Sequence, residues 1–323
     1  MKKIVVLGVG KQGSIVVNEM IKRKTEYVEF ATAEDTSEIY KTLNNTDMIF
    51  IVFKALGKEQ NTDLALKIAK EAKLADILTI AVPISGNAEE EDIQKFKDVS
   101  DAIILSSKKF YQYPRRTYLD IEAIVSLIAQ KSIGFDEVRE ALHNIGSVFI
   151  GVSYTEDCDS DSIHRAYLEA RVQIPNKEDN YHNYIINIST DRNTSTDEIN
   201  EATDKIDRIC QQLYRSDTQT NMCGHVFDEK LDGVCRITLI VGMHDAGYRD
   251  YDEMLAYEYS YRFPSKMTEH IEKGLTEKEI VKFGDCTKLL KVLLREGLTD
   301  LAALLIISKG VKTKDSGKND DTL

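Results

Sequence analysis

The stretch LGVGKQGS, Leu7–Ser14, decides how this chain folds. Its glycines Gly8, Gly10 and Gly13 fit the pattern G-x-G-x-x-G. The apolar run Lys3–Leu7 stands directly before the pattern, and apolar residues at helical spacing follow it. In parallel α/β sheets, a turn of this kind brings backbone N–H groups close to a phosphate. The sequence therefore predicts a strand, a tight phosphate-binding turn and a helix.

Strand and helix patterns alternate beyond this turn. Short apolar, β-branched runs predict further buried strands at residues 27–33, 47–53, 77–84 and 101–107. Helical spacing is found at residues 14–24 and 61–75. This order of elements is typical of an α/β domain with a parallel sheet.

A long helical pattern, residues 118–131, leads into a second α/β unit. Helices are expected there at residues 136–146, 161–172 and 196–213, and strands at 147–155, 183–190 and 235–243. From residue 250 onward the patterns are mostly helical, and the last dozen residues are polar. This final region includes an apolar stretch, residues 289–307, that must pack on the chain itself or on a partner.

Composition narrows the classes of function. The chain has 323 residues, 42% of them hydrophobic, and a formal net charge of −12. That balance disfavours binding to nucleic acid or to anionic lipid over a whole surface. The apolar run 301–308 is far shorter than the roughly 20 residues needed to span a bilayer, so no membrane insertion is expected. The first strand is expected to begin at the third residue, so no signal peptide is expected before it.

Five cysteines are present, and no two of them form a C-x-x-C motif. Because the number is odd, neither a disulfide framework nor a zinc site is expected. The expected state is reduced thiols in a cytoplasmic protein. The six histidines are scattered without the spacing of metal ligands. No metal is therefore predicted.

One interpretation of the glycine turn is a dinucleotide site for NAD(P). Glu34 and Asp35 follow Gly10 by 24 and 25 residues, close to the distance of about 20 expected for an acid that binds the ribose. This interpretation explains only the first 35 residues. The rest of the chain shows no arrangement of Lys, His or Tyr suited to hydride transfer.

A second interpretation covers about three quarters of the chain. KIVVLGVGKQGSIVVNEMI, NTDMIFIVFKALGKEQNTDLALKIAKEAK, SIGFDEVREALHNIGSVFIGVSYTED and GHVFDEKLDGVCRITLIVGM occur in this order. In order and spacing they resemble the strands, glycine loops and helices of the FtsZ branch of the tubulin/FtsZ superfamily. The resemblance implies an α/β, tubulin/FtsZ-like fold in four parts. These are a Rossmann-type, GTPase-like domain over residues 1–117, a central helix over 118–134, a second α/β domain over 135–248, and a helical extension with a disordered tail over 249–323.

The residues that the resemblance places at GTP or GDP depart from the family pattern. The family's phosphate loop is G-G-G-T-G-T-G, but the matching stretch here, KALGKEQNT, has Gly57 as its one glycine and carries Glu59. Residues with a Cβ restrict the backbone shapes that such a loop uses, while Lys54 and Lys58 supply positive charge. Losing several N–H donors, at roughly 1.5–3 kcal/mol each, would weaken nucleotide binding by orders of magnitude.

The ribose loop and the catalytic loop also differ. The family's Asn-Thr-Asp is replaced by Ala33-Glu34-Asp35, and only TSEIYKTLN joins this loop to the next strand. The family's N-x-D-F-A-D-V reaches the nucleotide of a neighbouring subunit, and its two acids polarise the attacking water. Here Gly134 replaces the first acid, Glu137 retains the second, and Asp136 is new. An acid at the start of a helix also interacts favourably with the helix dipole, so catalysis is not required to explain this pair.

These observations predict a divergent, self-associating or partner-binding protein of the prokaryotic cytoplasm, with little or no GTP hydrolysis. Two alternatives stay open: an active GTPase with an altered phosphate loop, and an NAD(P)-binding protein. The expected partners are further copies of the chain, head to tail, or a protein that docks on the C-terminal helices. The residues expected at the nucleotide are Gly8, Gly10, Lys11, Gln12, Gly13, Asn18, Asp35, Gly57, Lys58, Tyr118 and Asp120, and the residues of the degenerate catalytic loop are Asp136 and Glu137.

Overall fold

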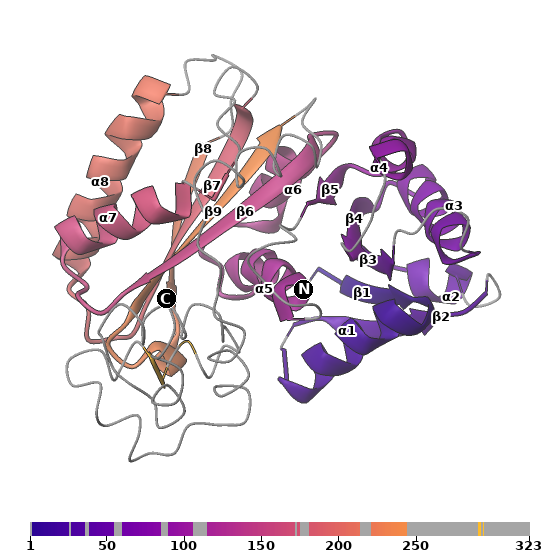
Figure 1. Cartoon of the computed structure of the whole chain (residues 1–323), viewed down its shortest axis with the longest axis horizontal. Helices are drawn as coiled ribbons and strands as arrows, with labels where there is room; N and C mark the ends of the chain where they lie inside the picture. Colours follow the sequence, from indigo (N-terminus) through magenta and orange to yellow (C-terminus); the bar gives the residue numbers. More distant parts are fainter. Residues whose placement is uncertain are drawn as a thin grey trace, which may run out of the picture.

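A computed structural model describes residues 2–25, 27–35, 39–54, 60–84, 90–105, 115–171, 173–174, 181–213 and 221–243, together with residues 290, 291 and 293. The first half of the fold alternates strands and helices (Figure 1). Its elements are β1 (Ile4–Val9), α1 (Gly10–Lys22), β2 (Glu29–Ala33), α2 (Ile39–Leu43), β3 (Met48–Lys54), α3 (Gln60–Leu74), β4 (Leu78–Ile84), α4 (Glu90–Lys97) and β5 (Ala102–Ile104).

Helix α5 (Arg115–Ala129) leads from this half to the second one and lies between the two in Figure 1. The second half contains α6 (Phe135–Leu142), β6 (Gly146–Thr155), α7 (Ser160–Arg171), β7 (Tyr181–Thr190), α8 (Thr196–Leu213), β8 (Asn221–Phe227), the short 3₁₀ helix η2 (Glu229–Leu231) and β9 (Cys235–Met243).

One nine-stranded sheet runs through both halves, in the order β2-β1-β3-β4-β5-β6-β9-β7-β8. Strands β1 to β6 are parallel, with β5 pairing β6 from Ala102↔Gly146 to Ile104↔Val148. Strand β9 is antiparallel to both of its neighbours, β6 and β7, while β8 is parallel to β7. The predicted α/β architecture is confirmed, and a continuous sheet joins the two units that the sequence suggested.

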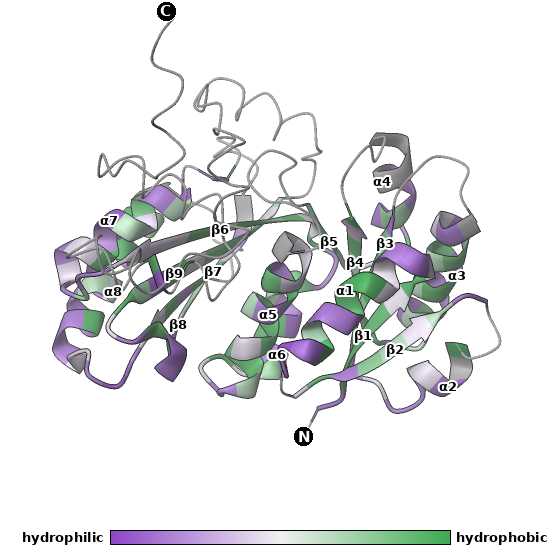
Figure 2. Ribbon diagram, turned by 60° about the horizontal axis from the view of Figure 1, so that its bottom comes forward, coloured by the Kyte–Doolittle hydropathy of each residue, from purple (hydrophilic) through white to green (hydrophobic). Residues whose placement is uncertain are grey.

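The parallel strands are apolar because helices cover both faces of the sheet. One face packs against α3, α4, α7 and α8, and its core includes Phe53, Phe96 and Tyr167. The other packs against α1, α5 and α6, and its core includes Met20 and Phe50. Figure 2 shows largely green strands flanked by helices that carry both green and purple residues, as expected for amphipathic helices on a buried sheet.

Several details differ from the predicted elements. Helix α1 begins at Gly10, four residues before the predicted start, and α5 begins at Arg115 and ends at Ala129, with a turn before α6. The connection between β2 and β3 contains the short helix α2, where none was expected. Strand β8 was not predicted, because its sequence NMCGHVF lacks a continuous apolar run.

The expectation that every cysteine is a reduced thiol was wrong for one pair. Cys158 and Cys235 form a disulfide, with their Cα atoms 5.7 Å apart and a sequence separation of 77. Cys210 and Cys223 are free. The backbone explains the pairing: Cys235 faces Thr155 in the β6–β9 ladder, and Cys158 lies three residues beyond that end of β6. Sequence spacing contains no sign of this proximity.

Two further expectations concern membrane insertion and the C-terminal region. No helix in the described residues is long and apolar enough to cross a bilayer. The proposed docking region, residues 249–323, lies outside the described residues except for positions 290, 291 and 293. Leu290 and Leu293 are buried.

Candidate nucleotide-binding and assembly site

The glycine turn lies at the point where the strand order of the parallel sheet reverses. The chain leaves β1 for β2 on one side, and β3 lies on the other side of β1. In open parallel sheets, the connections that follow such strands diverge and leave a crevice at the carboxyl ends of the strands. The turn after β1 meets this condition, so the fold places the quoted turn where ligands bind in such sheets.

Helix α1 presents an uncapped N-terminus at this crevice. Its N-cap residue, Val9, has extended backbone and makes no side-chain cap hydrogen bond, and the first turn contains no acidic residue. Gly10 opens the helix at φ +67°, a conformation that glycine adopts without strain. The first N–H groups of a helix lack intrahelical partners and carry the positive end of its dipole. This end of α1 is therefore suited to an anion.

The other two glycines are needed for close packing. A Cβ on Gly8 would lie 2.5 Å from the backbone carbon of Gly13, and a Cβ on Gly13 would lie 2.2 Å from the carbonyl oxygen of Val52 in β3. Real Cβ atoms do not approach backbone this closely, so α1 can rest against β1 and β3 only because both positions are glycine. The pattern thus divides into one turn residue and two packing residues.

The first turn of α3 faces the same glycine turn. A Cβ on Gly10 would lie 2.5 Å from the Asn61 side chain, so the Asn61 amide stands directly over the start of α1. Thr62 is 2% exposed, and its Oγ1 has no hydrogen-bond partner within the part of the chain that the structure describes. A buried hydroxyl without a partner is costly and calls for an explanation. An amide and a hydroxyl can both donate to a phosphate oxygen here.

Other predicted residues lie around α1. Lys11 and Asn18 are on its exposed face, Gln12 is half-buried, and Asp35 is exposed just after β2. Lys54 ends β3 and is partly exposed. Gly57 and Lys58 lie outside the described residues.

Tyr118 lies beside Arg23, near the end of α1 that is opposite the glycine turn. Tyr118 is 3% exposed, and the Arg23 guanidinium lies over its ring at 4.6 Å from the centroid. Arg23 directly follows α1, about 20 Å along the helix axis from Gly10. Asp120 is 1% exposed within α5. The structure therefore places Tyr118 at the far end of α1, away from the turn.

The degenerate catalytic loop opens α6. Gly134 is the N-cap, and Asp136 and Glu137 are exposed in the first turn. The Glu137 carboxylate folds back over Gly134, so that a Cβ on Gly134 would lie 2.2 Å from Glu137 Oε2. An acid at the third helical position commonly reaches back to the N-cap in this way. The helix-start interpretation of this acid is thus the one that the geometry favours.

The glycine turn and the start of α6 lie at opposite ends of the parallel strands. Lys2, just before β1, has its ammonium 5.0 Å from the ring centroid of Phe135, the first residue of α6. The glycine turn follows the other end of β1. The length of β1 therefore separates the acids of α6 from the crevice, and one chain cannot bring them together.

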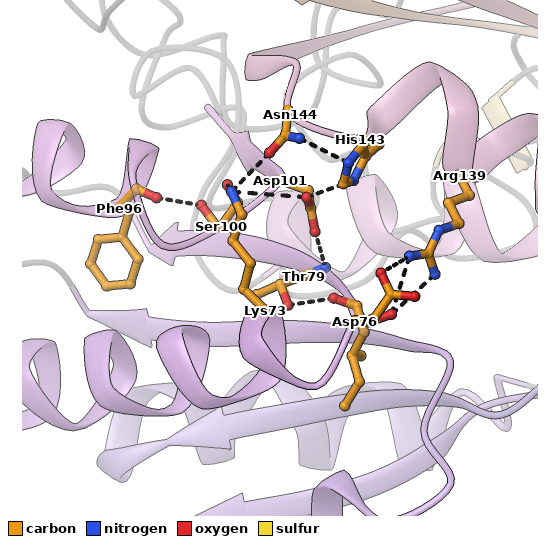
Figure 3. A network of polar contacts seen from close by, with 10 residues as sticks. Lys73, Asp76, Thr79, Phe96, Ser100, Asp101, Arg139, His143 and Asn144 are labelled. Atoms are coloured by element: carbon orange, nitrogen blue, oxygen red, sulfur yellow. Dashed lines mark hydrogen bonds and ion pairs between the residues drawn. The ribbon is translucent and has the colours of Figure 1, made fainter.

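A polar network fixes α6 against the first half of the fold (Figure 3). Asp101 is 3% exposed, accepts a 2.8 Å hydrogen bond from the Thr79 backbone N–H, and has an oxygen 2.9 Å from His143 Nδ1. Lys73 Nζ donates to Asn144 Oδ1 at 2.8 Å, and Asn144 Nδ2 lies 2.8 Å from His143 Nε2. Nothing in the sequence indicated this network, which joins residues of α3 and β4 with the residue before β5 and the two residues after α6.

No metal centre is seen in the described ranges: no group of three or more His, Cys, Asp or Glu side chains is placed to hold an ion. Phosphate binding here would rest on backbone N–H groups, the Asn61 amide, the Thr62 hydroxyl and nearby lysines. Each of these groups is a donor or a cation, as a phosphate requires.

Comparison with known proteins gives the context of this geometry. No protein-family model matches the chain. It is 22% identical over 311 residues to cell division protein FtsZ 2 of Rhizobium meliloti, a match that covers 74% of this chain and 87% of that one. It is 29% identical over 156 residues to the FtsZ of Aquifex aeolicus, covering 40% of this chain and 42% of the relative. The mitochondrial division protein fszA of Dictyostelium discoideum is 24% identical over 284 residues, 51% of its length.

Solved structures agree with these matches. An FtsZ dimer from M. jannaschii superposes with a TM-score of 0.61 at 16% identity, over 78% of this chain and 91% of that one. GDP-bound CetZ1 from Haloferax volcanii gives 0.56 at 12% identity, over 79% and 98%. TubZ from Bacillus thuringiensis gives 0.52 at 10% identity, over 79% and 92%. At such identities the structural likeness concerns the fold.

Proposed function

Because the chain is a divergent member of the FtsZ/tubulin superfamily, we propose that it is a cytoskeletal or scaffold protein that associates head to tail with copies of itself. We further propose that its nucleotide site is degenerate and that it hydrolyses little or no GTP. The observation that carries the proposal is that the crevice and the α6 acids lie at opposite ends of the parallel strands of one sheet.

Opposite placement fits a head-to-tail interface. In such an interface, one surface of a subunit meets a different surface of the next, and a repeated contact generates a filament. Stacking two copies along the strand direction would bring α6 of one to the α1 turn of the other. Among the similar structures, the M. jannaschii FtsZ is described as a dimer and the Bacillus thuringiensis TubZ as GDP-form protofilaments.

The α6 loop supports weak hydrolysis at that junction. The resemblance assigns its two acids to polarising water, but one position is Gly134 and the Glu137 carboxylate lies over that same glycine. A carboxylate displaced by about 1 Å from a productive position can cost about 100-fold in rate. Assembly therefore depends on the shape and charge of the two surfaces more than on turnover.

GDP or GTP is the nucleotide we propose for the crevice, bound more weakly than by a glycine-rich loop. The uncapped α1 terminus, the Asn61 amide and the buried Thr62 hydroxyl supply donors, and CetZ1, which shares the fold, is described as GDP-bound. Bound phosphate would also satisfy the Thr62 hydroxyl. Asn61 lies in the first turn of α3, so close to Gly10 that a Cβ at that position would be 2.5 Å from its side chain.

Light scattering and negative-stain microscopy of the full chain, with and without GTP, test the assembly. Linear polymers or concentration-dependent oligomers are expected in at least one condition, and a strict monomer at high concentration in both would overturn it. A phosphate-release assay tests the proposal that the chain hydrolyses little or no GTP. Turnover that rises steeply with protein concentration would show an active polymerising GTPase instead. Mass spectrometry of any copurified nucleotide distinguishes GDP from a dinucleotide.

A further inference from the structure

The disulfide joins two connections of the second half of the fold. Cys158 lies between β6 and α7, and Cys235 is the first residue of β9. Residues 228–234, which include η2 and lead directly into β9, form a segment that we call the η2 loop. Cys158 Sγ also lies 3.7 Å from the carbonyl oxygen of Gly233 in this loop. The bond therefore fixes the end of the η2 loop against the segment that leads into α7.

The η2 loop contains two consecutive residues with left-handed backbone. Asp232 has φ +49° and Gly233 has φ +82°. Glycine adopts such a conformation without strain, whereas Asp232 carries a Cβ and adopts it at a cost. A costly backbone conformation persists only where the surrounding structure holds it. A covalent bond at the end of this loop supplies such a constraint.

The apolar core beneath the η2 loop is small. Leu231 and Val234 are fully buried, and together with Tyr154 they form a cluster that is separate from the cores on the two faces of the sheet. At its start, the loop is held by a 2.8 Å hydrogen bond from the Asp228 N–H to the Thr190 carbonyl oxygen. A segment with few buried apolar side chains opens at a lower free energy than the main core does. The loop is therefore the part of this region that depends most on the disulfide.

The neighbouring elements have constraints of their own. The β6–β9 ladder continues from the Thr155–Cys235 pair through nine aligned pairs to Ser147 and Met243. At the start of α7, the Asp159 carboxylate accepts hydrogen bonds from the Ser162 N–H at 2.9 Å and from Ser162 Oγ at 2.8 Å. Because these bonds do not involve sulfur, opening the disulfide leaves the ladder and the helix start in place and frees the η2 loop.

Cys158 is the sulfur that a reductant can reach. Cys235 is fully buried, whereas Cys158 is partly exposed and lies between the exposed residues Asp157 and Asp159. In thiol–disulfide exchange a thiolate attacks one sulfur and displaces the other, and access helps to decide which sulfur is attacked. Attack is therefore expected at Cys158, with Cys235 as the leaving group.

We propose that the Cys158–Cys235 disulfide is a reversible redox lock on the η2 loop. A small dithiol opens the lock: one of its thiolates attacks Cys158 Sγ and displaces the Cys235 sulfur, and its second thiol then breaks the mixed disulfide. The products are two cysteine thiols and the cyclic disulfide of the reagent, so two electrons and two protons pass to the protein. A small-molecule disulfide closes the lock by the reverse exchange and leaves as two thiols. The lock depends neither on a bound nucleotide nor on assembly.

Hydrogen–deuterium exchange of the full chain, measured by mass spectrometry at short labelling times, tests the lock. After treatment with dithiothreitol, amides of residues 228–234 are expected to exchange at least about tenfold faster than in the oxidised chain. Oxidised glutathione should restore the slow exchange. Equal exchange in the two forms would overturn the proposal. Faster exchange that spreads through α7, β7 and α8 at the same labelling times would overturn it as well, because the bond would then hold the whole second half.

Two variants separate the lock from a general effect of the reductant. Cys158→Ser should exchange like the reduced wild type, with or without dithiothreitol. The matched control, Cys223→Ser, removes a free thiol outside the pair and should keep the response of the wild type. A response to dithiothreitol that persists in Cys158→Ser, or that is lost in Cys223→Ser, would overturn the proposal. Peptide mapping of the oxidised wild type must also join Cys158 to Cys235, and any other pairing of Cys158 would overturn it.

Discussion

At the scale of single residues, the glycine turn shows how one pattern contains different physical requirements. Gly10 supplies a positive φ at the start of α1, whereas Gly8 and Gly13 let helix and strands approach. Of the three glycines, Gly10 alone is required by its backbone conformation. The motif would therefore persist in a chain that had lost its nucleotide, because two of its glycines are needed for the fold.

Replacing Gly13 with alanine tests this division. The new Cβ would lie 2.2 Å from the Val52 carbonyl, which belongs to a central strand and cannot move freely, so Gly13→Ala should cost about 2–3 kcal/mol of unfolding free energy. Gly134→Ala is the control. Its Cβ would meet only the flexible end of Glu137, and a cost below about 1 kcal/mol is expected. Urea denaturation measures both, and equal costs would contradict the packing argument.

His225 provides a prediction about pH. Burial lowers the pKa of His225, whose Nε2 lies 2.8 Å from Thr190 Oγ1. The unfolded chain then binds this proton more readily than the folded one does. Stability is therefore full above the ordinary pKa of about 6.5 and decreases as the pH falls toward the lower folded pKa.

The test compares wild type with His225→Gln in urea at about pH 7.5 and 5.5. The variant should lose less stability between the two values, because its side chain does not titrate. Other titrating groups are common to both proteins and cancel in the comparison. Parallel losses would show that His225 is not the group responsible.

At the scale of elements, the network of Figure 3 explains why α6 keeps its place. Asp101 is buried and joins β5 to β4 and α6 through Thr79 and His143. Asp101→Ala would leave the Thr79 N–H without its acceptor and should cost about 2–3 kcal/mol. Asp76→Ala removes the partner of Arg139 at an exposed site and should cost below about 1 kcal/mol. Thermal unfolding of both variants checks the difference, and a neutral Asp101→Ala would refute the structural role of the network.

The disulfide joins the end of β6 to the start of β9, across a segment that contains α7, β7, α8 and β8. Closing so long a loop stabilises a fold by about 2–4 kcal/mol. Reductant should therefore lower the melting temperature of the wild type and have little effect on Cys158→Ser. Burial raises the pKa of Cys223 to about 12 and also raises that of Cys210, so these thiols should not exchange with the pair. Peptide mapping without reductant should recover Cys158 linked to Cys235.

The sequence predicted the strands and helices whose pattern of apolar residues follows from the burial of that one element. Strands buried on both faces, such as β3 and β4, are continuous apolar runs and were found. Strand β8 lies at the edge of the sheet and alternates less clearly, so it was missed. The glycine turn was predicted because strand, turn and helix are local. Asn61, Thr62, Asp101 and the cysteine pair were not predicted as partners, because their contacts join segments far apart in sequence.

At the scale of the whole molecule, one continuous sheet sets the distance between the two surfaces. The α1 turn and the α6 acids lie at opposite ends of the parallel strands. The polar network at the end of α6 connects the surface that carries these acids rigidly to the first half of the fold. Two such surfaces on one rigid body make assembly directional. A symmetric dimer would instead use the same surface twice.

Mixing two variants distinguishes these arrangements. Asp136→Arg with Glu137→Arg reverses the α6 surface, and Lys11→Glu reverses the α1 surface, so each variant keeps one intact side. If subunits associate head to tail, neither variant alone should elongate, because every contact in a chain of one variant includes the altered surface. An equimolar mixture should gain a dimer, with the intact α1 surface of the first variant on the intact α6 surface of the second. Longer polymers in the mixture would show that the two reversed surfaces, which now differ in sign, also pair head to tail. Sedimentation velocity resolves monomer, dimer and polymer. Dimers in either variant alone, without gain on mixing, would show an interface that uses neither surface and would refute the head-to-tail proposal.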